Sequence, residues 1–228
     1  MEILDLDYTR CVTVLGTAHF TLRSLNEAYN AVQKLKPTDL AVELDMDRFR
    51  ILQSLNGSKM VGIRKCEFIG AVEGFGNVDA DIWLIDMSED EMQMRMEAIL
   101  GEEYKWFSRI GYPWFRPLDE EYRMWELGLK DEVLERNMER LENLRAKAPH
   151  IWRVLIEERN TVMAARIAWI ATQRLDNGEE PKILAVVGAA HVQGIESLLR
   201  NPRSISENLR RYCLKFSPPR LIRKVNVN

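Results

Sequence analysis

The chain has 228 residues, of which 46% are hydrophobic and 29% are charged, and its formal net charge is −3. These values indicate a globular protein with a substantial core, either one domain or one domain with an elaborated subdomain, and they exclude a disordered chain. The N-terminal residues lack the features of a signal peptide and the apolar runs have only strand length, so we expect a cytoplasmic protein without a membrane span. The three cysteines form no CxxC motif, so we expect neither a zinc knuckle nor a disulfide framework.

The first predicted element is a buried strand, Val12 to Leu15, which precedes the motif Gly16-Thr17-Ala18-His19. Glycine allows the backbone to turn sharply at the end of a strand, and ligands bind beyond the carboxyl ends of the strands in open α/β sheets. His19 is therefore a candidate site residue, although a histidine at this place also serves as a capping or packing residue. The apolar residues of the next segment share one face and predict a helix from Thr21 to Lys36.

A second strand, Leu40 to Leu44, contains Glu43 inside an apolar run. Burial of a carboxylate is costly without a partner, so Glu43 either belongs to a site or turns outward at the end of the strand. A helix is predicted from Met46 to Leu55. The glycines of residues 58–80 do not complete a dinucleotide-binding fingerprint, so we set a Rossmann site aside.

A third strand, Ala80 to Asp86, ends in a carboxylate. Asp86 or Ser88 suits the start of the next helix, and we interpret Asp86 as such a cap or as a residue that supports the site. Residues 88–147 have a variable helical pattern and predict a helical subdomain. Eight of the nineteen aromatic residues of the chain lie within residues 104–125. This aromatic segment is compatible with a lid, a substrate-binding wall, a homodimer surface or the ordinary core of a helical subdomain.

The helix predicted from Ile151 to Arg174 carries Arg159 in the middle of an apolar face. A buried guanidinium needs an anionic partner or several hydrogen bonds. The candidate partners are Glu43, Asp86 and a substrate carboxylate or oxyanion, and a purely structural pair with a glutamate is the alternative. His150, which follows a proline at the start of this helix, is interpreted as structural.

A fourth strand, Ile183 to Val187, precedes the motif Gly188-Ala189-Ala190-His191, so two of the three histidines occupy the same frame. A helix through Leu199 closes the core, and Leu221 to Val227 is expected to add an edge strand. Residues 200–228 carry eight Lys or Arg and one Glu, a balance of +7 that leaves −10 for the rest of the chain. This basic tail either packs on the acidic body or binds an anionic partner, and its lack of interleaved aromatic residues argues against nucleic acid.

Parallel pairing of these strands would bring four side chains to one edge of the sheet: His19, Glu43, Asp86 and His191. Arg159 would reach the same edge from its helix. Two imidazoles and a carboxylate suit a divalent transition metal such as Mn, Co, Fe or Zn. Such a metal lowers the pKa of a bound water and polarises a carbonyl, and Arg159 would stabilise the oxyanion that forms. In a metal-free alternative one histidine is a general base oriented by Glu43, and the spacing does not choose between the two.

This combination resembles the TraB/PrgY family, within the wider Tiki/TraB/GumN group, over about residues 10–200. The group is marked by two GxxH motifs, a glutamate shortly after the first motif and an Arg-Asn pair before the second. The strand at 80–86 also resembles the mid-chain strand of the family. The other matching stretches are Gly16 to His19, Val42 to Asp45, Glu158-Arg159-Asn160 and Val187 to His191.

The resemblance implies an α/β fold, with a central, mainly parallel sheet flanked by helices, similar to the erythromycin-esterase and haem-binding ChaN-like proteins. It also implies one pocket lined by His19, Glu43, Arg159 and His191, with Gly16, Gly188, Asn160 and Asp86 in support. We expect an α/β domain over residues 1–200, which includes the helical subdomain at about 88–147, and a basic C-terminal tail over residues 201–228.

Tiki members are described as metal-dependent peptidases that use Mn or Co, and TraB/PrgY members are linked to limiting peptide pheromone activity. We therefore expect a metal-dependent hydrolase of a peptide or another small carbonyl substrate, with His19, Glu43 and His191 as ligands to Mn or Co, or else to Zn or Fe. The alternatives are a non-catalytic pocket protein for a peptide, haem or another anionic ligand, and a partner-binding protein that uses the aromatic segment and the basic tail. Many TraB-type chains carry C-terminal membrane helices that are not seen here, and the segment 56–80 is shorter than the family's helical insert, so membrane placement and pheromone biology are not carried over.

Overall fold

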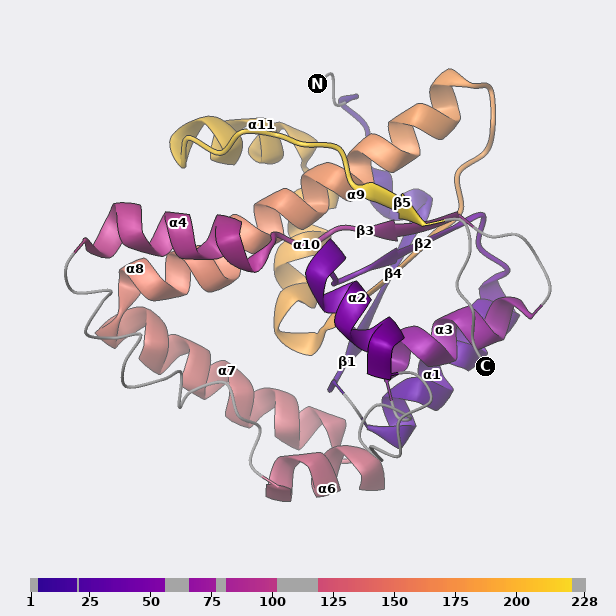
Figure 1. Cartoon of the computed structure of the whole chain (residues 1–228), viewed down its shortest axis with the longest axis horizontal. Coiled ribbons are helices and arrows are strands. Elements are labelled where there is room, and N and C mark those ends of the chain that lie inside the picture. Colours follow the sequence, from indigo (N-terminus) through magenta and orange to yellow (C-terminus); the bar gives the residue numbers. More distant parts are fainter. Residues whose placement is uncertain (1–3, 20, 56–65, 77–80, 102–118, 223–228) are drawn as a thin grey trace.

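The computed structural model describes residues 4–19, 21–55, 66–76, 81–101 and 119–222, and in these ranges it shows a five-stranded sheet with helices on both faces (Figure 1). The strand order is β1-β4-β2-β3-β5, in which the first four strands are parallel and β5 pairs antiparallel with β3. The bounds are β1 (Val12–Thr17), β2 (Asp39–Val42), β3 (Asp81–Leu84), β4 (Ile183–Gly188) and β5 (Arg220–Ile222). The predicted α/β class, with a mainly parallel sheet flanked by helices, is confirmed.

The helices connect the strands and cover both faces of the sheet. Their bounds are α1 (Leu22–Leu35), α2 (Met46–Leu55), α3 (Glu67–Phe75), α4 (Glu89–Leu100), α6 (Asp119–Leu127), α7 (Lys130–Lys147), α8 (Pro149–Trp152), α9 (Arg159–Asp176), α10 (Val192–Arg200) and α11 (Pro202–Arg211). Short 3-10 turns occupy Tyr8–Arg10 and Ala189–His191, and a π-helical turn, Arg153–Glu158, joins α8 to α9. Within the described ranges, no helix is long and apolar enough to cross a membrane.

Both faces of the sheet are buried because helices cover each of them. Successive side chains of a strand point to opposite faces, so each strand contributes to both cores. In β4, Ile183, Ala185 and Val187 pack in the cluster formed with α9, α10 and α11. Leu184 and Val186 of the same strand face the other way, into the cluster formed with α1, α2 and α3. In the described residues the result is a three-layer α/β/α arrangement, and in such arrangements ligands bind at the carboxyl ends of the strands.

Helix α3 is absent from the predicted elements, because the glycines of its segment suggest a break. Gly70 and Gly74 instead lie on the face of α3 that contacts α1. A Cβ at Gly70 would lie 2.2 Å from the carbonyl oxygen of Leu25, and one at Gly74 would lie 2.8 Å from Cβ of Val32. The glycines therefore allow two helices to approach closely. The sequence pattern did not predict this helix because the pattern does not show which helix packs against it.

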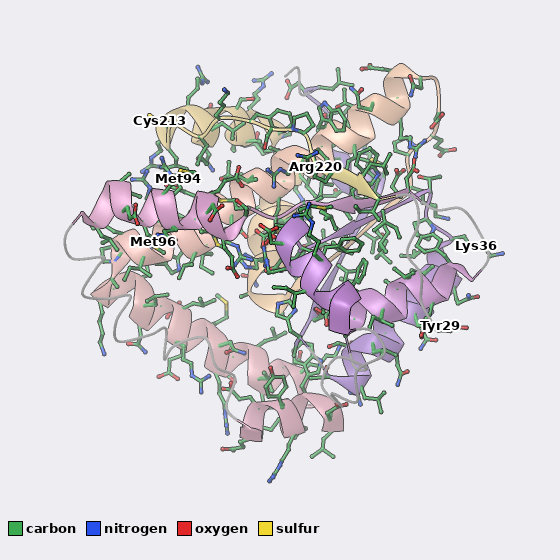
Figure 2. The ribbon with its side chains drawn as sticks, in the orientation of Figure 1. Tyr29, Lys36, Met94, Met96, Cys213 and Arg220 are labelled. Atoms are coloured by element: carbon green, nitrogen blue, oxygen red, sulfur yellow. The ribbon has the colours of Figure 1, made fainter. Side chains whose placement is uncertain are left out.

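The helices between β3 and β4 form an arm: α4 leads away from the sheet, α6 contacts α1, and α7 and α8 lead back to α9 (Figure 1). Ser88, rather than Asp86, caps α4 in a capping box with Glu91. Figure 2 shows Met94 and Met96 on α4; Met96 is buried against Leu144 of α7, whereas Met94 is exposed. Residues 102–118, which hold most of the aromatic segment 104–125, lie outside the described residues.

The C-terminal segment is part of the same fold. Helix α11 packs on α9 through the fully buried Ile205, and β5 covers the edge of β3. The expected edge strand therefore begins at Arg220, one residue earlier than predicted, and its predicted continuation at residues 223–228 lies outside the described residues. The described part of the basic tail is packed on the body of the protein.

Candidate active site

Parallel pairing places both GxxH motifs at one edge of the sheet. Gly16 is in register with Val187, and Thr17 with Gly188, so the two motifs leave neighbouring strands at the same level. The Glu43 amide donates to the carbonyl oxygen of Val186 at 3.1 Å, which places the end of β2 beside them. The predicted convergence of the strand ends is therefore seen directly in the hydrogen-bond register.

The two motif glycines serve close approach and not a turn, which corrects the prediction. Gly16 and Gly188 are strand residues with no positive φ. A Cβ at Gly16 would lie 2.7 Å from Cγ2 of Val192, next to the second motif. A Cβ at Gly188 would lie 3.1 Å from Nε2 of His19, in the first motif. Each glycine thus leaves room for the other motif.

Glu43 is the residue on which the other groups converge. It is 8% exposed, and its Oε2 accepts a hydrogen bond of 2.5 Å from the backbone N–H of Gly188. Its Oε1 accepts from Nη2 of Arg159 and lies 3.5 Å from Nε2 of His191. A carboxylate inside an apolar strand is therefore satisfied by hydrogen bonds from two distant parts of the chain, the Gly188 amide and the Arg159 guanidinium.

Arg159 joins Glu43 to Asp86, which are two of the candidate partners that the sequence offers. Its Nε donates to Asp86 Oδ1 at 3.0 Å, and its Nη2 donates to Asp86 Oδ2 at 2.6 Å. Arg48 donates to the same Oδ2 at 2.6 Å. Burial raises the pKa of Asp86, but the charges and hydrogen bonds of Arg159 and Arg48 outweigh it and hold the pKa well below its usual range.

His191 is fixed by the residue that follows Arg159. Its Nδ1 lies 2.6 Å from Oδ1 of Asn160, which can only accept, so Nδ1 carries the proton and Nε2 is left with its lone pair toward Glu43. Asn160 reaches this position because the neighbouring residue of α10 is Gly194, where a Cβ would lie 2.1 Å from Nδ2 of Asn160. Burial lowers the pKa of His191, and the opposing charge of Glu43 does not restore it, so the ring is neutral at pH 7.

His19 is half-exposed and is fixed by Glu67, the first residue of α3. The two are joined by a contact of 2.5 Å between Nδ1 and Oε1. Burial would lower the pKa of His19, but the hydrogen bond and the charge of Glu67 raise it to about 9. The site thus contains two imidazoles, each held through Nδ1, on either side of one buried carboxylate.

The chemistry of the donor set fits a divalent transition metal, since imidazole nitrogens and carboxylate oxygens are its common ligands. Metal-binding histidines usually donate their other ring N–H to an oxygen acceptor, and both His19 and His191 do so. The missing Cβ of Gly188 leaves a space 3.1 Å from His19 Nε2 and 3.2 Å from Glu43 Oε2. As arranged in the part of the chain that the structure describes, no three His, Cys, Asp or Glu side chains form a ready metal site.

A cavity of about 140 Å³ opens beside these residues. Its polar wall consists of His19, Glu43, Arg48 and Glu67. Two of these, Arg48 and Glu67, were not among the predicted site residues, and neither was Gly194. Arg48 and Glu67 are ordinary charged helix residues in the sequence, and only the packing of α2 and α3 against the end of the sheet brings them to the site.

The fold and this edge define a class of α/β protein in which two GxxH motifs from parallel neighbouring strands enclose a glutamate and an arginine. The profile of the TraB/PrgY/gumN family matches residues 74–204, more than half of the chain, and the chain belongs to that family. The matched range includes Asp86, Arg159 and His191, whereas His19 and Glu43 lie before it.

The chain is also similar to an uncharacterized protein, MJ1365, of Methanocaldococcus jannaschii. The two are 26% identical over 227 residues, which cover 83% of this chain and 53% of the archaeal protein. The chain therefore spans about half the length of the curated relative that it matches.

Proposed function

We propose that this protein hydrolyses a peptide or another small carbonyl compound at the edge of the sheet where the two GxxH motifs meet. The observation that carries the proposal is the orientation of the two imidazoles. Glu67 and Asn160 each accept from Nδ1 of a histidine, which leaves both Nε2 atoms beside Glu43. Holding reactive groups in place in this way is typical of catalytic sites, because it removes the cost of orienting them during the reaction.

In the metal-dependent version, His19, Glu43 and His191 hold Mn or Co, or else Zn or Fe. The bound metal would lower the pKa of a water and polarise the substrate carbonyl. Arg159 keeps Glu43 in position from the other side, since its Nε and Nη2 already donate to Asp86 and Glu43. Oxygen acceptors such as Glu67 and Asn160, which accept from Nδ1 of His19 and His191, orient the histidines of metal sites.

A metal-free version is favoured by one further observation: Glu43 already has Arg159 on one oxygen and the Gly188 amide on the other. In this version Nε2 of His191 takes a proton from water while the water oxygen bonds to the carbonyl carbon. The same proton passes to the leaving group when its bond to that carbon breaks. His19, at the half-exposed mouth, donates to the oxyanion.

Elemental analysis together with an activity screen tests both versions. Purified protein is incubated with Mn, Co, Zn or Fe salts, desalted and analysed for bound metal, and it is then assayed on fluorogenic peptides and p-nitrophenyl esters with and without a chelator. The variants are His19→Ala and His191→Ala, and the matched control is His150→Ala, which removes the exposed third histidine on α8.

Each version makes its own prediction. Metal binding by the parent that is lost in both site variants, with turnover that is lost on chelation, supports the metal-dependent version. Turnover that survives chelation but falls about 10²–10⁴-fold in His191→Ala supports the metal-free version. Absence of turnover under every condition overturns the hydrolase proposal and favours the alternative, a non-catalytic pocket protein that binds a peptide.

A further inference from the structure

The wall of the cavity opposite the charged residues is apolar. It is formed by Val42, Leu44, Leu52, Cys66, Phe68 and Val186. Phe68 is held in place by an edge-to-face contact with Phe49, with the ring centroids 5.9 Å apart. This wall joins the ends of β2 and β4 to α2 and α3, so it is built from elements of the rigid core.

The charged side chains that line the cavity are already paired within the protein. His19 is paired with Glu67 at 2.5 Å, and Glu43 accepts from Arg159 and from the Gly188 amide. Arg48 is joined to Asp45 and Asp86 and also donates to the carbonyl oxygen of Met87 at 3.0 Å. A charged group that entered the cavity would lose its hydration without gaining an ionic partner, which is strongly unfavourable.

The volume of the cavity sets the size of its occupant. At about 140 Å³ it is close to the roughly 150 Å³ of an apolar protein cavity that binds benzene, and it is well below the roughly 300–1,000 Å³ of pockets for drug-sized ligands. A phenyl ring or a branched aliphatic side chain fits this space, whereas a haem does not.

We infer that this cavity is the specificity pocket of the site and receives one uncharged aromatic or branched aliphatic side chain of the substrate, next to the carbonyl that reacts at Glu43 and the two histidines. The inference rests on the proposed function for the reaction, but the selective binding of an apolar side chain follows from the cavity alone. The preferred substrates are therefore peptides or acyl compounds with Phe- or Leu-like groups at the reacting carbonyl.

The experiment measures binding separately from turnover. N-acetyl amides of Phe, Leu, Lys and Gly are titrated into the full chain, and binding is followed by the methyl NMR signals of isotopically labelled Leu and Val. The variants are Leu52→Trp, which fills the cavity, and Leu52→Ala, which enlarges it. The control variants are Ile51→Trp and Ile51→Ala, because Ile51 is the adjacent residue of α2 and is 55% exposed. Turnover of the matching p-nitrophenyl esters is measured in parallel.

The inference predicts that the Phe and Leu amides bind at least tenfold more tightly than the Lys and Gly amides. Leu52→Trp should abolish this preference, Leu52→Ala should shift it toward the larger side chain, and the Ile51 variants should leave it unchanged. Equal binding of all four amides, or an unchanged preference in both Leu52 variants, overturns the inference. Selective binding without turnover overturns the hydrolase proposal alone, and turnover without selectivity overturns the specificity pocket alone.

Discussion

Glu43 and Gly188 are in direct contact at the edge of the sheet where the two GxxH motifs meet. The Gly188 amide donates to Glu43, and the absent side chain of Gly188 leaves the space next to Nε2 of His19. A single methyl group at this position therefore tests the site without removing any of its functional groups.

Gly188→Ala is expected to lower turnover or ligand binding at least tenfold while it changes the free energy of unfolding by no more than about 1 kcal/mol. The backbone at Gly188, with φ −58° and ψ 140°, is accessible to alanine, and the new Cβ would lie 3.1 Å from His19 Nε2. Gly16→Ala is the comparison, because its Cβ would lie 2.7 Å from Val192 and should destabilise the fold by about 1–3 kcal/mol. Urea unfolding and the activity assay together check the difference, and equal stability losses in both variants would contradict it.

Asp86→Asn is expected to destabilise the protein by about 3–5 kcal/mol at pH 7, because it leaves the buried guanidinium of Arg159 without its main counter-ion. Asp47→Asn is the control: Asp47 pairs with Arg50 on the surface, where both side chains are about two-thirds exposed, so its loss should cost less than about 1 kcal/mol. Urea unfolding of the two variants and the parent gives both values.

The effect of Asp86→Asn should also depend on pH. Arg159 and Arg48, acting against burial, hold the pKa of Asp86 in the folded protein below its value in the unfolded chain, which is about 4. The ionised carboxylate therefore contributes its full stability above about pH 4, and this contribution is lost as the pH falls toward the folded-state pKa. The difference in unfolding free energy between parent and variant should shrink from pH 7 to about pH 3, and a difference that grows on acidification would refute this assignment.

At the scale of the element, a π-helical turn directly precedes Arg159 and Asn160 at the start of α9. The turn covers Arg153–Glu158, and π-helical turns change the register of the residues that follow them. Glu158 is fully buried and accepts from Nε of Arg95 at 2.7 Å and from Nε of Arg153 at 2.8 Å. These bonds fix the last residue of the turn, so we assign Glu158 as a positioning residue for the pair that follows.

Glu158→Gln is expected to cost about 1.5–3 kcal/mol of stability and to disturb the contact between Asn160 and His191. Nitrogen NMR of the His191 ring should then show a mixture of tautomers in place of the Nδ1-protonated form. Glu157→Gln is the matched control, because Glu157 is the adjacent residue, is only partly buried, and accepts a hydrogen bond of 3.0 Å from the hydroxyl of Tyr212. A His191 spectrum that is unchanged in Glu158→Gln would show that the residue is structural alone.

At the scale of the whole molecule, the sheet and both helical layers form one unit with the C-terminal segment. Ile205 of α11 belongs to the same core cluster as Ile167 of α9 and Ile183 of β4. The C-terminal segment therefore cannot be removed as a separable tail, and deletion of residues 201–228 is a poor test of a partner-binding role. Substitution of exposed basic side chains, such as that of Arg203, is the better test.

Ile205→Ala is expected to lower the free energy of unfolding by about 2–5 kcal/mol, because it opens a cavity in a fully buried part of the core. Leu127→Ala is the control, since Leu127 is 75% exposed and its loss should change stability by no more than about 0.5 kcal/mol. Thermal or urea unfolding measures both, and a small effect at Ile205 would indicate that α11 is only loosely attached.

The sequence by itself determined the apolar runs of the four parallel strands, the helical patterns between them and the set of residues at the strand ends, because these features depend on local hydrophobic pattern and chain order. It did not predict α3, the π-helical turn or the roles of Glu67 and Arg48. The glycines of α3 are explained only by the surface of α1, and Glu67 and Arg48 become site residues only when their helices pack at the edge of the sheet. Those contacts join residues far apart in the chain, so only the tertiary structure decided that Glu67 meets His19 and that Arg48 meets Asp86.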